Sequence, residues 1–435
     1  MSDALAEIRP YVEAFKRRGL TGEPAWLTKR REGAMKRFAE LGFPSRRQEA
    51  WRYTNLQSLQ KASFPPADDA AAIETAALAP WCYPGEAHRL VLINGRFSPD
   101  HSAIGALPKG VWLASTAQTL KDRADLLQSA LRETDTIGGQ PFVSLNAALF
   151  EDGFVLALEP GATLDKPVEI AHFGKGDQGS FHLRNLVMLG AGSRATLIES
   201  YAGEGAYWTN AAGVIGLGQG AALTHVKLQD ESASAIHLAQ NRIELGRDAR
   251  YESFALTLGA KLSRHDSQAR LEGEGAECHL NGAFLLRGTQ EATNVTFADH
   301  AAPRGTTREL FKGVAEGSAH GAFLGTIAVR PNAQKTDAHM LNNNLLLSPR
   351  AAIDTKPELD ILADDVKCGH GATVGDLDDE ALFYLESRGL PAPEARQMLI
   401  AAFAADALDR VENKDLRAFL DVHAQRWLAG RESCA

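Results

Sequence analysis

The nine residues 189–197 read LGAGSRATL, and three later stretches repeat their pattern: LGQGAALTH at 217–225, LGRDARYES at 245–253 and LEGEGAECH at 271–279. Each stretch begins with a leucine, passes through a short polar or glycine-rich turn and enters an alternating strand. The leading leucines are 28, 28 and 26 residues apart. A strand–turn–strand unit that recurs at a nearly constant period predicts a solenoid, in which each unit buries its apolar face against its neighbours.

The β pattern extends beyond these four units. Short β-favouring runs punctuated by glycine fill residues 154–366, and helical periodicity is nearly absent there. We expect further units, after longer insertions, to open at Val314 and Leu347. An ordinary β-sandwich also places turns every ~8 to 12 residues and is the alternative fold. The near-constant period favours the solenoid.

Helical patterns flank the β region on both sides. Apolar residues recur at near-helical spacing in the first forty residues, where Pro24 suits a first helical position, and predict a short helix–turn–helix. The mixed segment that follows contains one clear strand at 89–93, which runs into an Asn94–Gly95 turn. Two apolar helical faces lie between 391 and 428, with a short helix expected at Asp379–Arg388.

These patterns predict a mainly β chain in three parts. Residues 1–150 form an N-terminal helical and mixed α/β region, 151–375 a β-helix core, and 376–435 a C-terminal helical domain. A solenoid needs its open end covered, so the C-terminal helices could cap it and carry a partner surface.

The composition excludes several classes of function. The 435 residues carry 46 basic and 55 acidic side chains, and a net charge of −9 argues against nucleic acid as a partner. No stretch approaches the ~18 to 20 apolar residues that span a bilayer, and the acidic N-terminus does not resemble a signal peptide. The four widely spread cysteines, Cys82, Cys278, Cys368 and Cys434, fit free thiols in a reducing compartment. We therefore expect a cytoplasmic protein without a membrane partner.

Nucleotide-binding motifs are weak or missing. Residues 174–179 read GKGDQG, but another strand follows instead of a helix, so we interpret the segment as a β-turn. The sequence contains no phosphate-binding loop of the GxxxxGK[ST] type. Any energy from ATP must therefore come from a partner.

The adjacent acids Asp230–Glu231, Asp364–Asp365 and Asp378–Asp379 do not predict an acid/base pair. Neighbours on a strand point to opposite faces, so the two carboxylates would not converge, and we expect solvated turns. No Ser/His/Asp arrangement has an interpretable context either.

Cys368–Gly369–His370 is the candidate metal site. Residues two apart on a strand project to the same side, so the thiolate and imidazole could share a soft metal or a partner's cluster. Two ligands are too few for a closed tetrahedral site, so another chain or exogenous sulfide must complete it. Cys278 and His279 are adjacent and should diverge, with Cys278 in the core.

The remaining histidines of interest are isolated in the sequence. For His300, His320 and His339 we expect one hydrogen bond each and no catalytic role.

Four stretches together resemble the SufB/SufD family: LSPRAAIDTKPEL at 347–359, DVKCGHGATVG at 365–375, LFYLESRGL at 382–390 and EAWRYTNL at 49–56. The resemblance implies a right-handed parallel β-helix with an N-terminal helical region and a C-terminal helical domain that docks a SufC-type ATPase. It also implies pairing with a SufB-type subunit, or with a second copy, through strands near the end of the solenoid.

In the family, the positions of Cys368 and His370 lie at that pairing interface, and the histidine is tied to cluster building. A short N-terminal region without a cysteine cluster resembles SufD-type members. Gly369 departs from the serine common in the family.

The expected function is that of a non-enzymatic scaffold of the SUF iron–sulfur cluster assembly system. We expect no stably bound cofactor, a transient iron–sulfur cluster or iron at the interface, and an ATPase contact on helices 391–428. One alternative is a SufB-like scaffold acting as a homodimer, and another is a purely structural oligomer. A carbohydrate-active or acyl-transferring β-solenoid enzyme is a third, disfavoured by the lack of a six-residue repeat.

Overall fold

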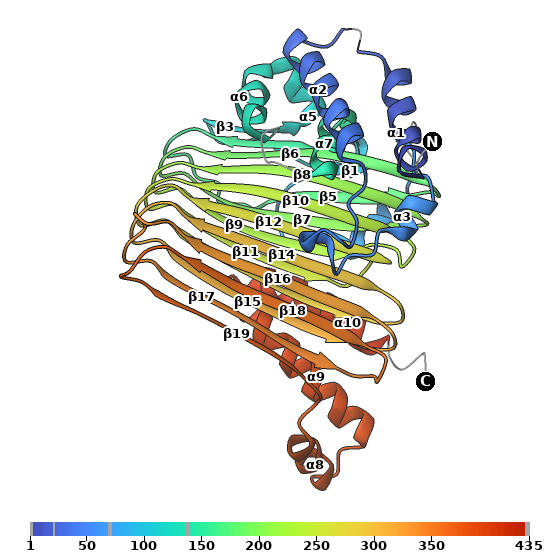
Figure 1. The fold of residues 1–435 in the computed structure, drawn as a ribbon, viewed down its shortest axis with the longest axis vertical. Coiled ribbons are helices and arrows are strands. Elements are labelled where there is room, and N and C mark those ends of the chain that lie inside the picture. The colour runs from blue at the N-terminus through green and yellow to red at the C-terminus, as the bar shows by residue number, and fades with distance from the viewer. Residues whose placement is uncertain (1–2, 21, 68–71, 135–139, 431–435) are drawn as a thin grey trace.

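The computed structural model describes residues 3–20, 22–67, 72–134 and 140–430, so Cys434 lies outside the described residues. Its centre is a flattened β-solenoid formed by two largely parallel sheets (Figure 1). Sheet A has nine strands: β3 (Val111–Ser115), β4 (Phe154–Leu158), β6 (Gly179–Leu189), β8 (Tyr207–Leu217), β10 (Ile236–Leu245), β12 (Leu262–Leu271), β14 (Glu291–His300), β16 (His320–Val329) and β18 (Ala352–Ile361).

Sheet B contains ten strands and faces sheet A across the solenoid lumen. They are β1 (His88–Ile93), β2 (Arg96–Phe97), β5 (Val168–Lys175), β7 (Arg194–Glu204), β9 (Ala222–Asp230), β11 (Arg250–Thr257), β13 (Glu277–Leu286), β15 (Thr306–Ala315), β17 (Asp337–Leu346) and β19 (Lys367–Gly375). Odd and even strands alternate between the sheets, so the chain winds as a parallel β-helix. The predicted mainly β solenoid is confirmed, and the sandwich alternative is wrong.

The predicted leucine repeat is a ladder inside sheet A. Parallel pairing joins the leading leucines in the order Leu189, Leu217, Leu245 and Leu271, each at the end of its strand. All four are buried in the apolar core of the lumen. Identical side chains in register pack against one another on successive turns, which is why the period is almost constant.

The expected unit starts at Val314 and Leu347 are wrong. The ladder continues from Leu271 to His300 and then to Val329, at the same near-constant spacing. Val314 lies in β15 of sheet B, and Leu347 follows β17, so both belong to the opposite edge of the solenoid. The pattern was missed because His300 replaces the leucine, and its Nε2 lies within hydrogen-bond distance of Thr307 Oγ1, at 2.8 Å.

The N-terminal region contains the predicted helix–turn–helix and a series of short helices. They are α1 (Asp3–Arg18), α2 (Ala25–Leu41), η1 (Glu49–Trp51), α3 (Gln57–Lys61), α4 (Thr75–Leu78), η2 (Ala79–Trp81), η3 (Pro99–His101), α5 (Thr116–Asp122), α6 (Ala124–Thr134) and α7 (Pro141–Leu149). Tyr11, Phe38 and Phe142 pack with Trp208 of β8 and so dock helices on the outer face of sheet A.

The predicted strand at 89–93 is β1, which pairs in parallel with β5. Asn94 and Gly95, at φ 49° and 75°, form the tight turn into β2. Strand β3 pairs antiparallel with β4 at the same end of the solenoid. The first turn of the solenoid is therefore extended by strands of the N-terminal region.

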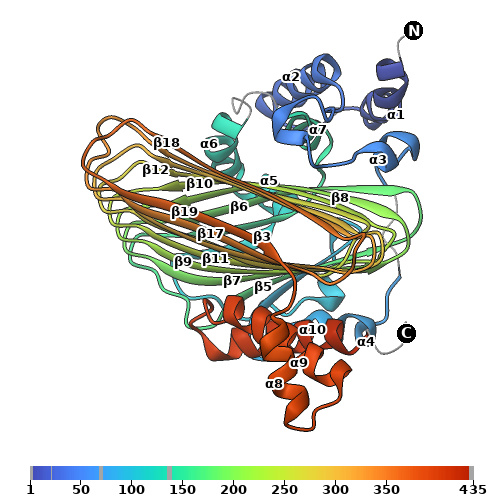
Figure 2. The same cartoon turned by 60° about the horizontal axis from the view of Figure 1, so that its bottom comes forward.

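The predicted C-terminal helices are α8 (Asp379–Ser387), α9 (Ala392–Leu408) and α10 (Lys414–Ala429). They lie against the outer face of sheet B, on the side opposite the N-terminal helices (Figure 2). The expectation that they cap the end of the solenoid is wrong, because their apolar side chains pack on Val226, Leu228 and Phe254 along its side. Strands β18 and β19 are the last strands of their sheets.

Strand β9 shows how both faces of sheet B are used. Val226 and Leu228 point outward beneath the C-terminal helices, and Leu223 of opposite parity belongs to the core of the lumen. His225 and Lys227 share the parity of Leu223 and are also buried. The lumen therefore has an apolar half along the leucine ladder and a polar half beside it.

None of the helices in the described ranges is both long and apolar enough to cross a membrane.

Candidate functional site at the open end of the solenoid

Cys368 and His370 lie on β19, the last strand of sheet B, whose outer edge pairs with no other strand among the residues that the structure describes. Their partners in register on β17 are Ala338 and Met340, which are fully buried in the core of the lumen. Paired positions in a parallel stack point the same way, so Cys368 and His370 face the lumen at its open mouth. Figure 2 shows β19 at this mouth.

The two predicted ligands differ in exposure. Cys368 is half-buried and packs against the apolar core of the lumen, whereas His370 is exposed. Burial raises the pKa of the Cys368 thiol, with a backbone hydrogen bond to Ala338 acting against it. A thiol with a raised pKa stays protonated at neutral pH, so a metal ion or a partner's cation must favour its thiolate form.

Two donors on one strand make an incomplete site. Alternate residues of a strand have Cα atoms about 6.6 Å apart, close enough for both side chains to reach one ion. The described ranges contain no cluster of three or more His, Cys, Asp or Glu side chains that could hold a metal. His339, on β17, has the opposite parity and lies 3.1 Å from Asp337, so it does not join the pair.

The site of Gly369, between Cys368 and His370, has room for either a glycine or a serine. A Cβ built at Gly369 would lie 3.4 Å from His339 Cδ2, an ordinary van der Waals contact. The serine common in the family would fit without displacing the backbone, so Gly369 leaves the direction of its neighbours unchanged.

The edge of β19 presents unpaired backbone groups. Lys367 N–H donates to Thr336 O, toward β17. In a parallel strand the backbone N–H and C=O of successive residues point alternately to one neighbouring strand and to the other. The amides of Cys368, His370, Ala372 and Val374 therefore face away from the sheet. A row of free N–H and C=O groups is a template for pairing with another strand.

The edge of β18 offers a less complete template. Ala352 N–H donates to Ala319 O, so the odd-numbered residues face the open side. Pro357 is one of them and has no N–H to donate, which suits an edge position. The edge of β19, from Lys367 to Gly375, contains no proline.

Most of the other sequence interpretations are confirmed. Cys278 is fully buried, and the segment 174–179 contains the end of β5, a three-residue connection at 176–178 and the start of β6. His320 Nε2 lies 2.7 Å from Asp354, a single polar contact as expected. Asp378 caps α8 by accepting hydrogen bonds from two backbone N–H groups.

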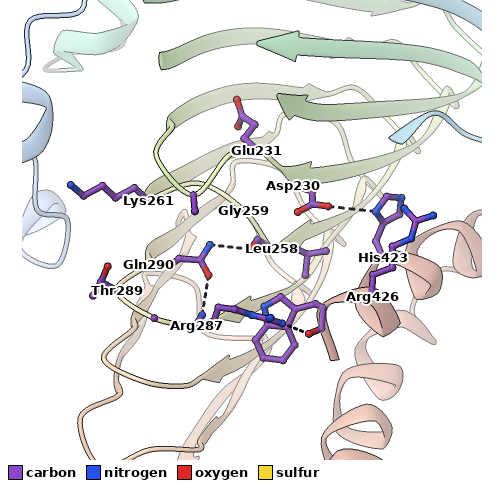
Figure 3. Close-up of a pocket in the computed structure, with 13 residues that line it drawn as sticks. Asp230, Glu231, Leu258, Gly259, Lys261, Arg287, Thr289, Gln290, His423 and Arg426 are labelled. Atoms are coloured by element: carbon purple, nitrogen blue, oxygen red, sulfur yellow. Dashed lines mark hydrogen bonds and ion pairs between the residues drawn. The ribbon is translucent and has the colours of Figure 1, made fainter. Parts of the chain in front are cut away.

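The expectation of a solvated turn at Asp230–Glu231 is wrong. Both acids line a cavity of about 550 Å³ between the turns of the solenoid and α10. Figure 3 shows Asp230 turned toward His423 and Glu231 turned away from it. Glu231 is buried in the polar half of the lumen, where it accepts hydrogen bonds from Thr209 Oγ1 and Gln229 Nε2.

Sequence reasoning missed a buried charged network in the lumen. Lys227 Nζ donates to His237 Nε2 at 2.8 Å, and His237 Nδ1 lies 2.7 Å from Glu231. Glu199 lies 2.9 Å from His225 Nε2 and accepts a hydrogen bond from a buried tyrosine. The only signal was polar residues at alternate positions of β9, which is also the pattern of an ordinary solvated face.

Electrostatics keep this network ionised. Burial lowers the pKa of Lys227 to about 8, with Glu199 and Glu231 acting in the opposite direction. Burial raises the pKa of Glu199, but the hydrogen bond to His225 and the charges around the carboxylate act against burial, and the net direction is downward. Burial, followed by the charge of Lys227, lowers the pKa of His237. The ammonium group of Lys227 thus lies between two buried carboxylates, each of which favours its charged form.

Glu309 is a separate buried acid deeper in the same stack as His370. It is paired in register with Met340, which is in turn paired with His370. Glu309 is 3% exposed and accepts a hydrogen bond from Thr296 Oγ1 at 2.6 Å. Burial raises the pKa of Glu309 to about 8, with this hydrogen bond acting against the shift.

The fold and the site define the class of protein: a β-solenoid with an exposed strand edge that carries a thiol and an imidazole on one face. Residues 172–403 match the family described as "SUF system FeS cluster assembly, SufBD core domain", and residues 13–170 match the "SufBD protein N-terminal region". The chain belongs to the SufBD family of the SUF iron–sulfur cluster assembly system.

Two of its relatives match at least nine-tenths of the chain. An iron–sulfur cluster assembly SufBD family protein of Synechocystis is 34% identical over 95% of this chain and 94% of its own length. The iron–sulfur cluster assembly protein SufD of Escherichia coli is 32% identical over 90% of this chain and 91% of its own. A SufBD family protein of Mycobacterium tuberculosis is 28% identical over 69% and 76%. The chain is thus SufD-like along most of its length.

Proposed function

We propose that this chain is a non-enzymatic scaffold subunit of the SUF complex that offers Cys368 and His370 to a partner subunit. The observation that carries the proposal is a half set of ligands on an unpaired strand edge at the open mouth of the lumen. Thiolate and imidazole are ligands that suit iron and iron–sulfur clusters. The cluster is the cargo of this site, assembled there and passed on.

A SufB-type subunit is the partner that the proposal requires, and a second copy of the chain is its substitute. Pairing along β19 would bring the partner's residues next to His370 and let them supply the missing ligands. The family match and the SufD of Escherichia coli support this assignment. The β19 edge supports it physically, because a β-sheet edge binds an added strand through main-chain hydrogen bonds.

The alternative of a carbohydrate-active or acyl-transferring enzyme receives less support from the geometry. Glu199 and Glu231 are buried inside the lumen, and each carboxylate lies next to a histidine. A glycosidase needs two carboxyl groups that face a common substrate cleft. Asp230 and Glu231 line one cavity, but Asp230 is turned toward His423 and Glu231 away from it, so their carboxyl groups do not converge (Figure 3).

We expect the SufC-type ATPase to bind the C-terminal helices at 391–428 and the face of α8 beside them. Figure 1 shows α8 projecting beyond the solenoid. Its Phe383 and Tyr384 are 72% and 57% exposed, and Met398 of α9 is also exposed. Aromatic and methionine side chains are enriched at protein interfaces.

Phe383→Asp is therefore expected to weaken capture of the ATPase by about tenfold, because a charge would replace an aromatic anchor of the interface. The affinity is measured with purified subunits by calorimetry. Leu41→Asp is the matched control, since Leu41 is an exposed apolar residue at the end of α2, outside the C-terminal helices. Equal affinities for Phe383→Asp and the parent chain would remove α8 from the contact.

The proposal as a whole is tested by co-expression with SufB-type and SufC-type chains. A ternary complex that elutes as one species and contains iron and acid-labile sulfide is the expected result. Failure of the chain to join either subunit would refute the scaffold assignment.

A further inference from the structure

The family-like segment at 49–56 folds as a strap along the outside of sheet A. We define the strap as residues 45–56, which follow α2 and include η1. Figure 1 shows this part of the chain, in blue, crossing the strands of the solenoid. The ring of Trp51 lies under the guanidinium of Arg264 in β12, 3.9 Å from its centroid. Arg264 Nη1 also donates to Thr54 Oγ1 at 2.9 Å.

The strap reaches the last strand of sheet A. Thr54 Oγ1 lies 3.0 Å from Thr293 Oγ1 on β14. Further along the sheet, Glu49 forms an ion pair with Lys356 on β18. Contacts on β12, β14 and β18 fix the strap beside the open edge of the solenoid. The two residues of the last contact, Glu49 and Lys356, are 307 positions apart in the sequence.

The strap carries three exposed arginines, Arg46, Arg47 and Arg52. Arg46 Nε donates to Arg52 O at 2.9 Å, so the backbone holds this side chain in place. None of the three forms a salt bridge with a carboxylate in the described part of the chain, whereas the strap's one acid, Glu49, is paired with Lys356. The result is a local excess of positive charge on a chain whose net charge is −9.

We infer that the strap is a second contact surface for the partner subunit and binds carboxylates that lie beside that subunit's own pairing strand. The inference rests on the proposed function, since it takes the open edge as the pairing site. Exposed guanidinium groups on a strap that is itself fixed near the last strand of sheet A fit acidic side chains by charge and by bidentate hydrogen bonding. Such a rim steers encounter and selects the partner more than it adds affinity.

A nucleic acid is a poorer fit for the same arginines. The outward face of the adjoining strand β18 bears Asp354, Glu358 and Asp360, whose carboxylates would repel a phosphate backbone that extended past the strap. A protein surface with a short acidic segment matches the small extent of the cluster.

The test is a triple charge reversal, Arg46→Glu, Arg47→Glu and Arg52→Glu, in the full chain. Affinity for the SufB-type subunit is measured at about 0.05 M and about 0.5 M salt, because the Debye length shrinks severalfold between them. We expect about tenfold weaker binding at the lower salt, mainly from slower association, and similar affinities at the higher salt.

The matched control reverses Lys29, Lys36 and Lys109, which are exposed residues away from the strap and change the net charge by the same amount. Unchanged affinity in the arginine variant, an equal loss at both salt concentrations, or an equal loss in the lysine variant would each overturn the inference. If the unmodified chain does not bind the subunit at all, the proposed function fails instead. Circular dichroism confirms that each variant is folded.

Discussion

Ala372→Pro is expected to weaken pairing of this chain with its partner about a hundredfold, and to do so without unfolding the solenoid. Ala372 lies on β19 with its N–H directed at the open edge, so proline removes no hydrogen bond to β17. It removes one donor of the intermolecular ladder and places a ring where the partner's strand must approach. Leaving the partner's acceptor without its donor costs about 1 to 3 kcal/mol, and with the clash of the ring this amounts to roughly two powers of ten in affinity.

Sedimentation of the chain alone and with a SufB-type subunit measures the effect. Ala372→Val is the control, because it keeps the N–H and enlarges only the side chain. Thr373→Pro should behave differently from both, since the N–H of Thr373 faces β17 and its loss should lower the melting temperature. If Ala372→Pro pairs as well as the parent chain, β19 is not the edge that the partner uses.

Glu309→Gln is expected to stabilise the protein at pH 7 by about 2 to 3 kcal/mol. The pKa of this buried carboxyl is about 8, compared with an ordinary value of 4.5. Between these values the unfolded chain has released the proton and the folded chain has not, so stability falls as pH rises from 4.5 toward 8. At pH 7 the penalty is about 3 kcal/mol at 1.36 kcal/mol per unit.

Glutamine resembles the neutral acid in shape and can still accept the hydrogen bond from Thr296. The variant should therefore match the parent chain at pH 4 and exceed it increasingly up to pH 8. Denaturant unfolding at several pH values measures this difference, and Glu40→Gln, an exposed substitution on α2, is the control. Parallel stability curves for Glu309→Gln and the parent chain would show that Glu309 is ionised in the folded state.

The solenoid was predictable because its repeat appears directly in the sequence. Leu189, Leu217, Leu245 and Leu271 occupy one register position on successive turns, so their spacing equals the length of one turn. The prediction failed where the ladder residue changed to His300. A buried imidazole with a hydrogen bond fills the same place, and hydrophobicity alone does not identify it.

The sequence does not reveal which face of a strand is inside. On β9 the apolar residues Val226 and Leu228 lie outside beneath helices, and the polar residues His225 and Lys227 lie inside the lumen. Alternation gives the period of a strand, but an element from a distant part of the chain decides which face is covered. For this reason the buried network was not predicted from the sequence, and a solvated turn was wrongly expected at Asp230–Glu231.

The candidate ligands were found because their chemistry is local. Cys368 and His370 are two residues apart, so their common face follows from strand geometry alone. Their position at the open mouth depends on β19 being the last strand of sheet B. The mouth stays uncovered because the C-terminal helices pack along the side of sheet B and not across its end. That arrangement required the structure.

The most direct test of the scaffold account is the iron and acid-labile sulfide content of the co-purified complex after His370→Ala. His339→Ala is the control, because His339 lies on the neighbouring strand and faces the opposite side. Loss of a residue that only hydrogen-bonds to a metal ligand lowers metal affinity about 10-fold to 100-fold, and loss of the ligand itself should cost at least as much. We predict a His370→Ala complex of unchanged subunit composition with less than about a tenth of the parent cluster content. A fully loaded His370→Ala complex would contradict the account.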